Sequence, residues 1–332
     1  MIALLGATGY TGRLVAAELD RRGIPHRRGG RSAARLAALP PSDAGEPFVV
    51  DADEPARLDA FLDGADALIT TVGPFGRLGL PVVEAAVRSG VPYVDSTGEP
   101  DFMSHVYAKF ADAPTPVVPA CGFDYIPGDL AAAVAAQALG GDVAEVGVTY
   151  EIGVWLPSRG TARSALDVVE ALELIPRRRR VAFPDGVRAA VEVPWGERLT
   201  VPRHLPDARV WSAVVVPGPI APIVERVAAP AAVAGARLLG RVAGRLPEGP
   251  PDRLRARARF RVLVEAIGRR GRAAVLCEGR DVYGLTARFL VEAAGRVRGA
   301  GARSPAEALD AVAFLDAVSG DGALGSFAWR RA

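Results

Sequence analysis

The stretch that decides the fold is "GATGYTG", residues 6–12, which directly follows the apolar run "MIALL" at residues 1–5. The apolar run predicts a buried parallel strand, and "TGRLVAAELDRRG" predicts an amphipathic helix that stops at Gly23. A strand, a glycine turn and a helix in immediate succession form the context that a dinucleotide-binding loop requires. Backbone N–H groups at the start of such a helix point at the pyrophosphate.

Each glycine of the loop has a separate predicted role. Gly6 permits the tight turn, Gly9 lets a phosphate approach the backbone, and Gly12 allows the helix to pack closely on the strand. A plain strand-to-helix turn is the alternative interpretation. The residues of this loop predicted to bind the cofactor are Gly6, Thr8, Gly9, Tyr10, Thr11 and Gly12.

The composition sets limits on the kind of protein. The chain has 332 residues, 50% of them hydrophobic, which is enough for two domains with separate cores. A net charge of +2 gives no indication of a nucleic-acid partner. Cys121 and Cys277 lie far apart with no metal-ligand spacing around them, so we expect no metal site and a reducing, cytoplasmic compartment. We find no signal peptide and no apolar segment long enough to span a membrane.

Strand-like and helical patterns alternate over residues 1–142. Six such strands with intervening helices predict an α/β fold, an N-terminal Rossmann doubly wound parallel sheet that binds its ligand beyond the carboxyl ends of the strands. The predicted strands lie in "IALL", "IPHRRGG", "PFVVDA", "ADALITTVGPF", "PYVDST" and "TPVVPACGFD".

The pattern changes over residues 143–284, which we interpret as a second α+β domain covering the ligand site. Its predicted antiparallel strands are "AEVGVTYEI", "RVWSAVVV" and a hairpin of "DRLRARARFRVLVEAI" with "GRAAVLCEGRD" through "GRRGR". Helices are expected over 161–172 and 221–246. Residues 285–332 are expected to form C-terminal helices, one of them over 304–318, that pack back on the first domain.

The end of the second strand indicates which nucleotide the loop binds. An NAD-preferring site has an acidic residue at this position to accept from the ribose 2′-OH, and here no carboxylate lies between Asp20 and Asp43. Arg31 and Ser32 are instead placed to bind a 2′-phosphate, which favours NADP(H). Arg27 or Arg28 could assist them, or these arginines could simply cover a surface strand.

Two further strand ends complete the predicted cofactor site. Asp51, which closes the third strand, is expected on the adenine side. The stretch Thr71–Phe75 closes the fourth strand and is expected on the nicotinamide side, with Gly73, Pro74 and Phe75 as candidate contacts.

Four motifs together resemble the saccharopine dehydrogenase-like family, in particular a bacterial branch that includes trans-acting enoyl reductases. They are "GATGYTG", "GRSAARLAAL", "TVGPFGRLGLPVVEAAVRSGVPYVDSTGE" and "VPACGFDYIPGDL", and the resemblance resumes in "SRGTARSAL", "EGPPDRLRARARFRVLVEA" and "YGLTARFLVEAA". The resemblance implies an NADP(H)-dependent oxidoreductase that reduces a conjugated C=C of an acyl thioester. C=N or C–N chemistry, as in the namesake enzyme, and a non-catalytic NADPH-binding protein are the alternatives. Tyr125 departs from the family pattern "GFDSIP", where a serine is expected.

Candidates for the chemistry lie at the fifth and sixth strand ends. Asp124 could donate a proton or anchor a cationic imine, although helix capping or turn chemistry is the interpretation we favour for it. Tyr125 could donate from an exposed phenol to a developing enolate. Cys121 is expected to be a small buried residue, and Asp95 and Glu99 are expected to cap the next helix.

The partner of such an enzyme would be a small-molecule or carrier-bound acyl substrate. Arginines at every second position of "DRLRARARFR", residues 252–261, would share one face of a strand, either solvated or docking an acidic acyl-carrier protein. The run "RRRR" at 177–180 carries the same two interpretations, and the apolar stretch 227–245 could line an acyl channel. Each of the histidines is expected on the surface or in the core. The sequence is compatible with a homo-oligomer.

Overall fold

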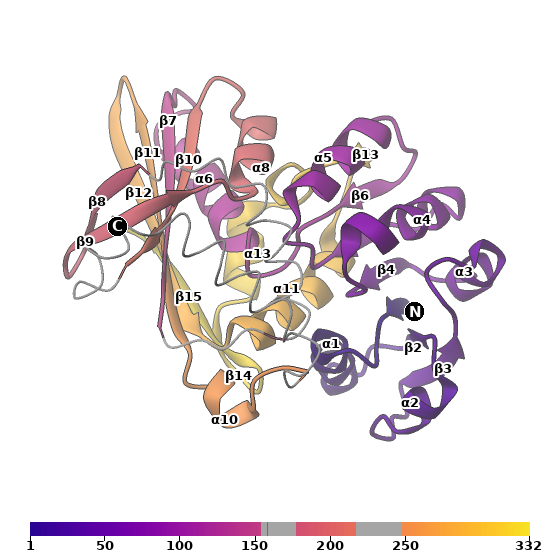
Figure 1. Cartoon of the computed structure of the whole chain (residues 1–332). Coiled ribbons are helices and arrows are strands. Elements are labelled where there is room, and N and C mark those ends of the chain that lie inside the picture. The colour runs from indigo at the N-terminus through magenta and orange to yellow at the C-terminus, as the bar shows by residue number, and fades with distance from the viewer. Residues whose placement is uncertain (154–157, 159–176, 217–247) are drawn as a thin grey trace.

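A computed structural model describes residues 1–153, 158, 177–216 and 248–332, which form two sheets with helices between and around them (Figure 1). Within these residues the first sheet has seven parallel strands in the order β13-β6-β5-β4-β1-β2-β3. The strands are β1 (Ile2–Leu5), β2 (His26–Gly30), β3 (Gly45–Val49), β4 (Ala67–Thr70), β5 (Tyr93–Asp95), β6 (Pro116–Val118) and β13 (Gly301–Ala302). The predicted doubly wound parallel sheet is confirmed.

Both faces of this sheet are buried, as expected for parallel strands between helices. Along β1, Ile2 and Leu4 contribute to one core cluster, and Ala3 and Leu5 contribute to another on the opposite face. The helices that follow the strands in turn are α1 (Tyr10–Arg21), α2 (Ala33–Ala37), α3 (Pro55–Leu62), α4 (Phe75–Arg88), α5 (Pro100–Lys109) and α6 (Ile126–Ala138).

The second sheet has eight strands among the described residues, in the order β14-β15-β12-β11-β7-β10-β9-β8. Its strands are β7 (Glu145–Ile152), β8 (Arg178–Phe183), β9 (Gly186–Val193), β10 (Arg209–Val215), β11 (Arg259–Gly268), β12 (Gly271–Arg280), β14 (Gly320–Gly322) and β15 (Gly325–Arg331). The predicted hairpin of β11 and β12 is confirmed. The expectation of antiparallel pairing throughout is wrong at one point, because β10 pairs with β7 in parallel.

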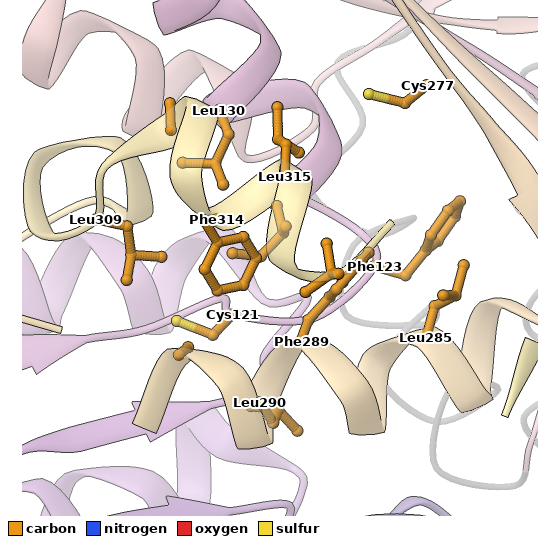
Figure 2. Close-up of a cluster of buried hydrophobic side chains, with 14 of the residues drawn as sticks. Cys121, Phe123, Leu130, Cys277, Leu285, Phe289, Leu290, Leu309, Phe314 and Leu315 are labelled. Atoms are coloured by element: carbon orange, nitrogen blue, oxygen red, sulfur yellow. The ribbon is translucent and has the colours of Figure 1, made fainter. Parts of the chain in front are cut away.

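Helix α6 links the two sheets and is buried over most of its length, with a sequence that is largely apolar. It packs against β11, β12 and α13 (Ala311–Ala317). In Figure 2, Leu130 of α6 lies among side chains of α13 and of α11 (Val282–Arg296), and Cys121 lies beside them. Cys121 is fully buried, as predicted.

The end of the chain returns to both sheets. Helix α11 packs on α1 and on the first sheet, β13 pairs with β6, and β15 pairs with β12. The helix predicted over 304–318 is divided into α12 (Pro305–Ala308) and α13. The division occurs because Asp310 caps a new helix, its carboxylate accepting from the Ala313 N–H at 3.0 Å.

The arginine-rich stretch 252–261 is not one continuous strand, so that prediction is wrong. Residues Asp252–Arg255 form the short helix α10, and the strand begins only at Arg259. Arg255 is buried beside Asp281, whereas Arg257 is exposed. The arginines therefore do not share one face of a strand, although Arg253, Arg257 and Arg259 are exposed.

Some expectations have other outcomes. The hairpin of β8 and β9 was not predicted, and Arg178 to Arg180 of the "RRRR" run lie in β8. The helices expected over 161–172 and 221–246, and the acyl channel over 227–245, lie outside the described residues.

Helix α8 (Glu197–His204) lies between α6 and β10. No described helix has both the length and the apolar character needed to cross a membrane.

Candidate functional site at the carboxyl edge of the parallel sheet

The glycine loop leaves no room for side chains at two of its positions. Gly6 has a φ of +89°, and a Cβ there would lie 2.8 Å from Thr71 Oγ1. A Cβ at Gly12 would lie 2.0 Å from the carbonyl oxygen of Gly6. Only glycine fits both positions, because the first helix packs directly against the end of the first strand.

The start of α1 faces the carboxyl edge of the sheet and can receive an anion. Gly9 is the residue before the helix, no side chain caps it, and the first turn contains no acid. Thr8, Gly9, Tyr10 and Thr11 are all partly exposed. The loop follows β1, the strand flanked by β2 and β4, where the chain order of the sheet reverses and dinucleotides bind. This geometry fits a pyrophosphate, and contacts from these residues to a cofactor stay a prediction.

The side chain of Tyr10 points away from this loop and toward the second half of the chain. Its hydroxyl donates to the carbonyl of Pro250 at 2.8 Å, and its ring packs edge-on against Tyr283 with centroids 5.2 Å apart. Burial raises the pKa of Tyr10 to about 12. Tyr10 therefore joins the two halves of the molecule beside the loop.

The end of β2 presents a mixture of free and engaged polar groups. Arg31 is exposed and makes no hydrogen bond or ion pair within the described part of the chain. Ser32 caps α2, its hydroxyl accepting from the Arg35 N–H at 3.3 Å. The expectation that Arg27 or Arg28 assists is not supported, because each is engaged elsewhere: Arg27 binds Glu46, and Arg28 is buried against Asp20.

Sequence reasoning missed three charged residues beside the glycine loop. Arg13 and Arg35 each donate to the carbonyl of Thr8 at 2.9 Å. Each also pairs with the carboxylate of Glu248, with N to O distances of 2.7 Å. The available signal was position: Arg13 directly follows the loop, and Arg35 lies on α2 just after β2. Nothing local in the sequence points to Glu248.

The two other predicted cofactor segments differ in accessibility. Asp51 is half-buried just after β3, and its carboxylate accepts from the Ala52 N–H at 2.7 Å. Gly73 is exposed and Pro74 is partly exposed, so both can border a ligand. Phe75 is buried and its ring packs against Phe102, with centroids 5.6 Å apart, so its side chain belongs to the core.

Asp124 is a free carboxylate that follows β6, on the side of the sheet where the strands have their carboxyl ends. It lies in the turn before α6 but does not cap the helix, so the capping part of the favoured interpretation is wrong: the helix begins after Tyr125 and has no side-chain cap. Within the described part of the chain the Asp124 carboxylate makes no hydrogen bond. The residue is exposed to solvent, yet surrounding protein desolvates it and raises its pKa to about 6.

Tyr125 does not present the exposed phenol that the sequence suggested. It is 3% exposed, and its hydroxyl donates to the carbonyl of Gly98 at 3.2 Å. Burial raises its pKa well above the ordinary value. A Cβ at Gly196 would lie 2.6 Å from its ring, which shows how closely the second half of the chain covers it. Tyr125 thus fixes the loop that carries Asp124.

Asp95 and Glu99 do not cap the helix that follows them. Glu99 instead accepts from the Phe75 and Gly76 N–H groups at 3.0 and 2.8 Å, so it caps the preceding helix, α4. The fold brings that helix start beside Glu99, and its free N–H groups attract the carboxylate. Asp95 is fully buried, accepts from the Tyr93 hydroxyl at 2.6 Å, and has its pKa raised to about 6 by burial.

A buried polar network lies directly below Asp124. The hydroxyl of Tyr150 contacts both the Asp124 carbonyl and the Glu197 carboxyl group, and Ser212 donates to Glu197 at 2.8 Å. Burial raises the pKa of Glu197 to about 7. Because a phenol has one proton, a neutral Glu197 that donates to Tyr150 lets Tyr150 donate to the Asp124 carbonyl.

Comparison with known proteins agrees with the nucleotide part of this site. Residues 6–95 match the NAD(P)H-binding family, so this part of the chain is an NAD(P)H-binding domain. Trans-acting enoyl reductases of Mycobacterium tuberculosis and Mycobacterium ulcerans are 40% and 41% identical to the chain over 140 residues. Each alignment covers 39% of this chain and 34% of the relative, so the chain matches about a third of the length of these curated relatives.

The complete fold also has a known counterpart. Saccharopine dehydrogenase (L-Glu forming) from Saccharomyces cerevisiae is 12% identical and superposes with a TM-score of 0.66 over 100% of this chain and 99% of that one. The parallel sheet and the second mixed sheet therefore form a saccharopine dehydrogenase-like fold. At this identity the likeness establishes the fold alone.

Proposed function

We propose that this protein is a cytoplasmic NADP(H)-dependent oxidoreductase that reduces a conjugated C=C of an acyl thioester presented by a carrier. The observation that carries the proposal is one sheet edge with a glycine-lined anion site at one end and Asp124, accessible but desolvated, at the other. The 40% identity to trans-acting enoyl reductases supports the choice of reaction, and their name supports a carrier-bound substrate.

The residues of the chain divide the work between binding and proton transfer. The bound cofactor supplies a hydride, which for an enoyl thioester goes to the β-carbon. The glycine loop and the start of α1 hold the pyrophosphate, and Arg31 and Ser32 hold the 2′-phosphate. Asp124 donates the proton that the α-carbon needs, because a carboxyl group with a pKa of about 6 is partly protonated near neutral pH.

The network below Asp124 keeps this acid in place. Tyr150 holds the Asp124 carbonyl, and Tyr125 holds the neighbouring loop through Gly98. Both tyrosines are buried, so the backbone on either side of Asp124 is fixed. Asp124 can thus meet a substrate without a rearrangement of its own loop.

The direct test is oxidation of NADPH by purified protein with a short enoyl thioester, with and without an acyl-carrier protein. We expect turnover that falls as the pH rises through about 6, since Asp124 must be protonated to donate. Asp124→Asn should lower kcat by about 100-fold and leave the Kd of NADPH unchanged. Asp59→Asn, an exposed carboxylate that pairs with Arg88, is the matched control.

Two results would contradict the proposal. Turnover only with an imine, or with an amino diacid in the oxidative direction, would assign C=N or C–N chemistry to the same site. Tight NADPH binding without hydride transfer to any acceptor would leave a non-catalytic NADPH-binding protein.

A further inference from the structure

Glu248 brings a carboxylate from the second half of the chain to the edge of the glycine loop. Its two oxygens are divided between two cations, Oε1 lying 2.7 Å from Arg35 Nη2 and Oε2 lying 2.7 Å from Arg13 Nη1. Both guanidinium groups also donate to the Thr8 carbonyl. The two arginines therefore form one anion-binding cluster built on the loop itself, and Glu248 is the anion that it holds.

The backbone next to Glu248 is fixed on the same loop. The Tyr10 hydroxyl donates to the Pro250 carbonyl, and a Cβ at Gly249 would lie 2.4 Å from the Tyr10 ring. Only glycine permits this approach, so the chain after Glu248 lies directly on the first turn of α1. The contacts of Tyr10 with Gly249 and Pro250 therefore hold the Glu248 carboxylate beside the arginines.

The cluster lies where a dinucleotide places its adenosine ribose. Gly30 ends β2, and a Cβ there would lie 3.5 Å from the Thr8 side chain. Arg31 follows directly and is exposed without a partner in the described part of the chain. The ribose of a bound dinucleotide lies at this strand end. Arginine binds carboxylate and phosphate with the same paired N–H groups.

We propose that Glu248 occupies the place of the cofactor 2′-phosphate and competes with it for Arg13 and Arg35. This inference rests on the proposed function, because it assumes that the glycine loop binds NADP(H). Arg13 and Arg35 thereby become 2′-phosphate ligands in addition to Arg31. Because it opposes the 2′-phosphate, this one carboxylate lowers the preference for NADP(H) over NAD(H).

The exchange replaces two ion pairs that are partly exposed to water. The side chains of Glu248, Arg13 and Arg35 are 39%, 39% and 52% exposed, so their ion pairs are screened by water. A phosphate carries more negative charge than a carboxylate and can contact several arginines at once. Displacement of the Glu248 carboxylate opens the two arginines to it.

The test measures binding of 2′,5′-ADP, which carries the 2′-phosphate, and of 5′-AMP, which lacks it, by isothermal titration calorimetry. In Glu248→Gln the affinity for 2′,5′-ADP should rise by about tenfold, because the competing charge is gone while the shape is kept. The affinity for 5′-AMP should stay within about twofold. Glu84→Gln on α4 removes the same charge from an exposed pair with Lys109 and should change neither value.

A second pair of variants shows whether the arginines receive the phosphate. Arg35→Ala should weaken 2′,5′-ADP binding, and the double variant Glu248→Gln with Arg35→Ala should lose most of the gain. Unchanged or weaker 2′,5′-ADP binding in Glu248→Gln overturns the inference while the nucleotide site stands. Weaker 5′-AMP binding in that variant would show instead that Glu248 accepts from a ribose hydroxyl. If no variant binds either nucleotide, the proposed function fails as well.

Discussion

The two ends of the sheet edge are built in different ways. At the glycine loop the backbone makes the site, because Gly6 and Gly12 leave no space for a side chain. At the Asp124 end buried side chains make it, since Tyr150 and Glu197 come from other elements and meet below the Asp124 carbonyl. One end is encoded in consecutive residues, and the other exists only after the chain has folded.

This difference explains what each end tolerates. A loop that is held by close backbone packing fails when any side chain is added. A buried polar network fails when a charge or a proton is misplaced, because an unpaired polar group is costly in the interior. The comparison can therefore be tested by adding volume at one end and by changing protonation at the other.

The largest effect should come from Gly12→Ala. The added Cβ would lie 2.0 Å from the Gly6 carbonyl oxygen, and neither backbone segment can move away without opening the helix from the strand. We expect the free energy of unfolding to fall by about 3 kcal/mol and NADPH binding to be lost. Urea denaturation and calorimetric titration measure the two effects.

Gly295→Ala is the matched control for that substitution. Gly295 is exposed on α11, and a Cβ there meets nothing within 4 Å. The variant should be unchanged or up to about 1 kcal/mol more stable, because alanine favours a helix. Equal effects of the two substitutions would show that close packing does not constrain the glycine loop.

The next effect concerns Glu197, whose pKa burial raises from 4.5 to about 7. A carboxyl group with a raised pKa in the folded state stabilises the protein below the unfolded pKa and loses that stabilisation as the pH rises through the folded pKa. Wild-type protein should therefore lose about 3 kcal/mol from this group between pH 4.5 and 7. Glu197→Gln, which keeps a donor for Tyr150, should lack this component.

Urea denaturation of both proteins across this pH range isolates the contribution as a difference between two curves. Parallel curves of the free energy of unfolding against pH would mean that Glu197 is ionised in the folded protein over this pH range. The Asp124 end would then be held by a charged network, unlike the neutral one described above.

The smallest effect should come from Arg31→Ala at the exposed end of β2. The Kd of NADPH should rise about tenfold, because one charge-assisted contact to the 2′-phosphate is lost, and the Kd of NADH should stay the same. Arg330→Ala, which removes an exposed arginine of β15, is the control. An equal loss of affinity for both nucleotides would place Arg31 at the pyrophosphate.

The sequence was informative wherever a feature depends on neighbouring residues. Alternating apolar runs and glycines predicted the parallel sheet, and "GRRGR" predicted the hairpin of β11 and β12. The hairpin of β8 and β9 carried a similar signal in "FPDGV", a turn of the Asp-Gly kind. Periodicity failed at residues 252–261 because alternating arginines also fit a short helix followed by a strand.

The rest of the site depends on contacts between distant segments. Glu99 follows the pattern of a cap for α5, yet the start of α4 lies beside its carboxylate in the fold. The partners of Glu197 and the position of Glu248 are set by pairing of strands and by packing of helices. No local pattern encodes such contacts, so electrostatics at the Asp124 end could not be predicted.

The return of the chain end to both sheets has a consequence for the order of folding. Strand β13 covers the edge of β6, and β15 covers the edge of β12. Until residues 301–331 leave the ribosome, both edges present unpaired N–H and carbonyl groups. The glycine loop and its first helix can form early, but neither sheet is closed until synthesis has passed this segment. An intermediate that lacks it exposes two edges that other chains can join.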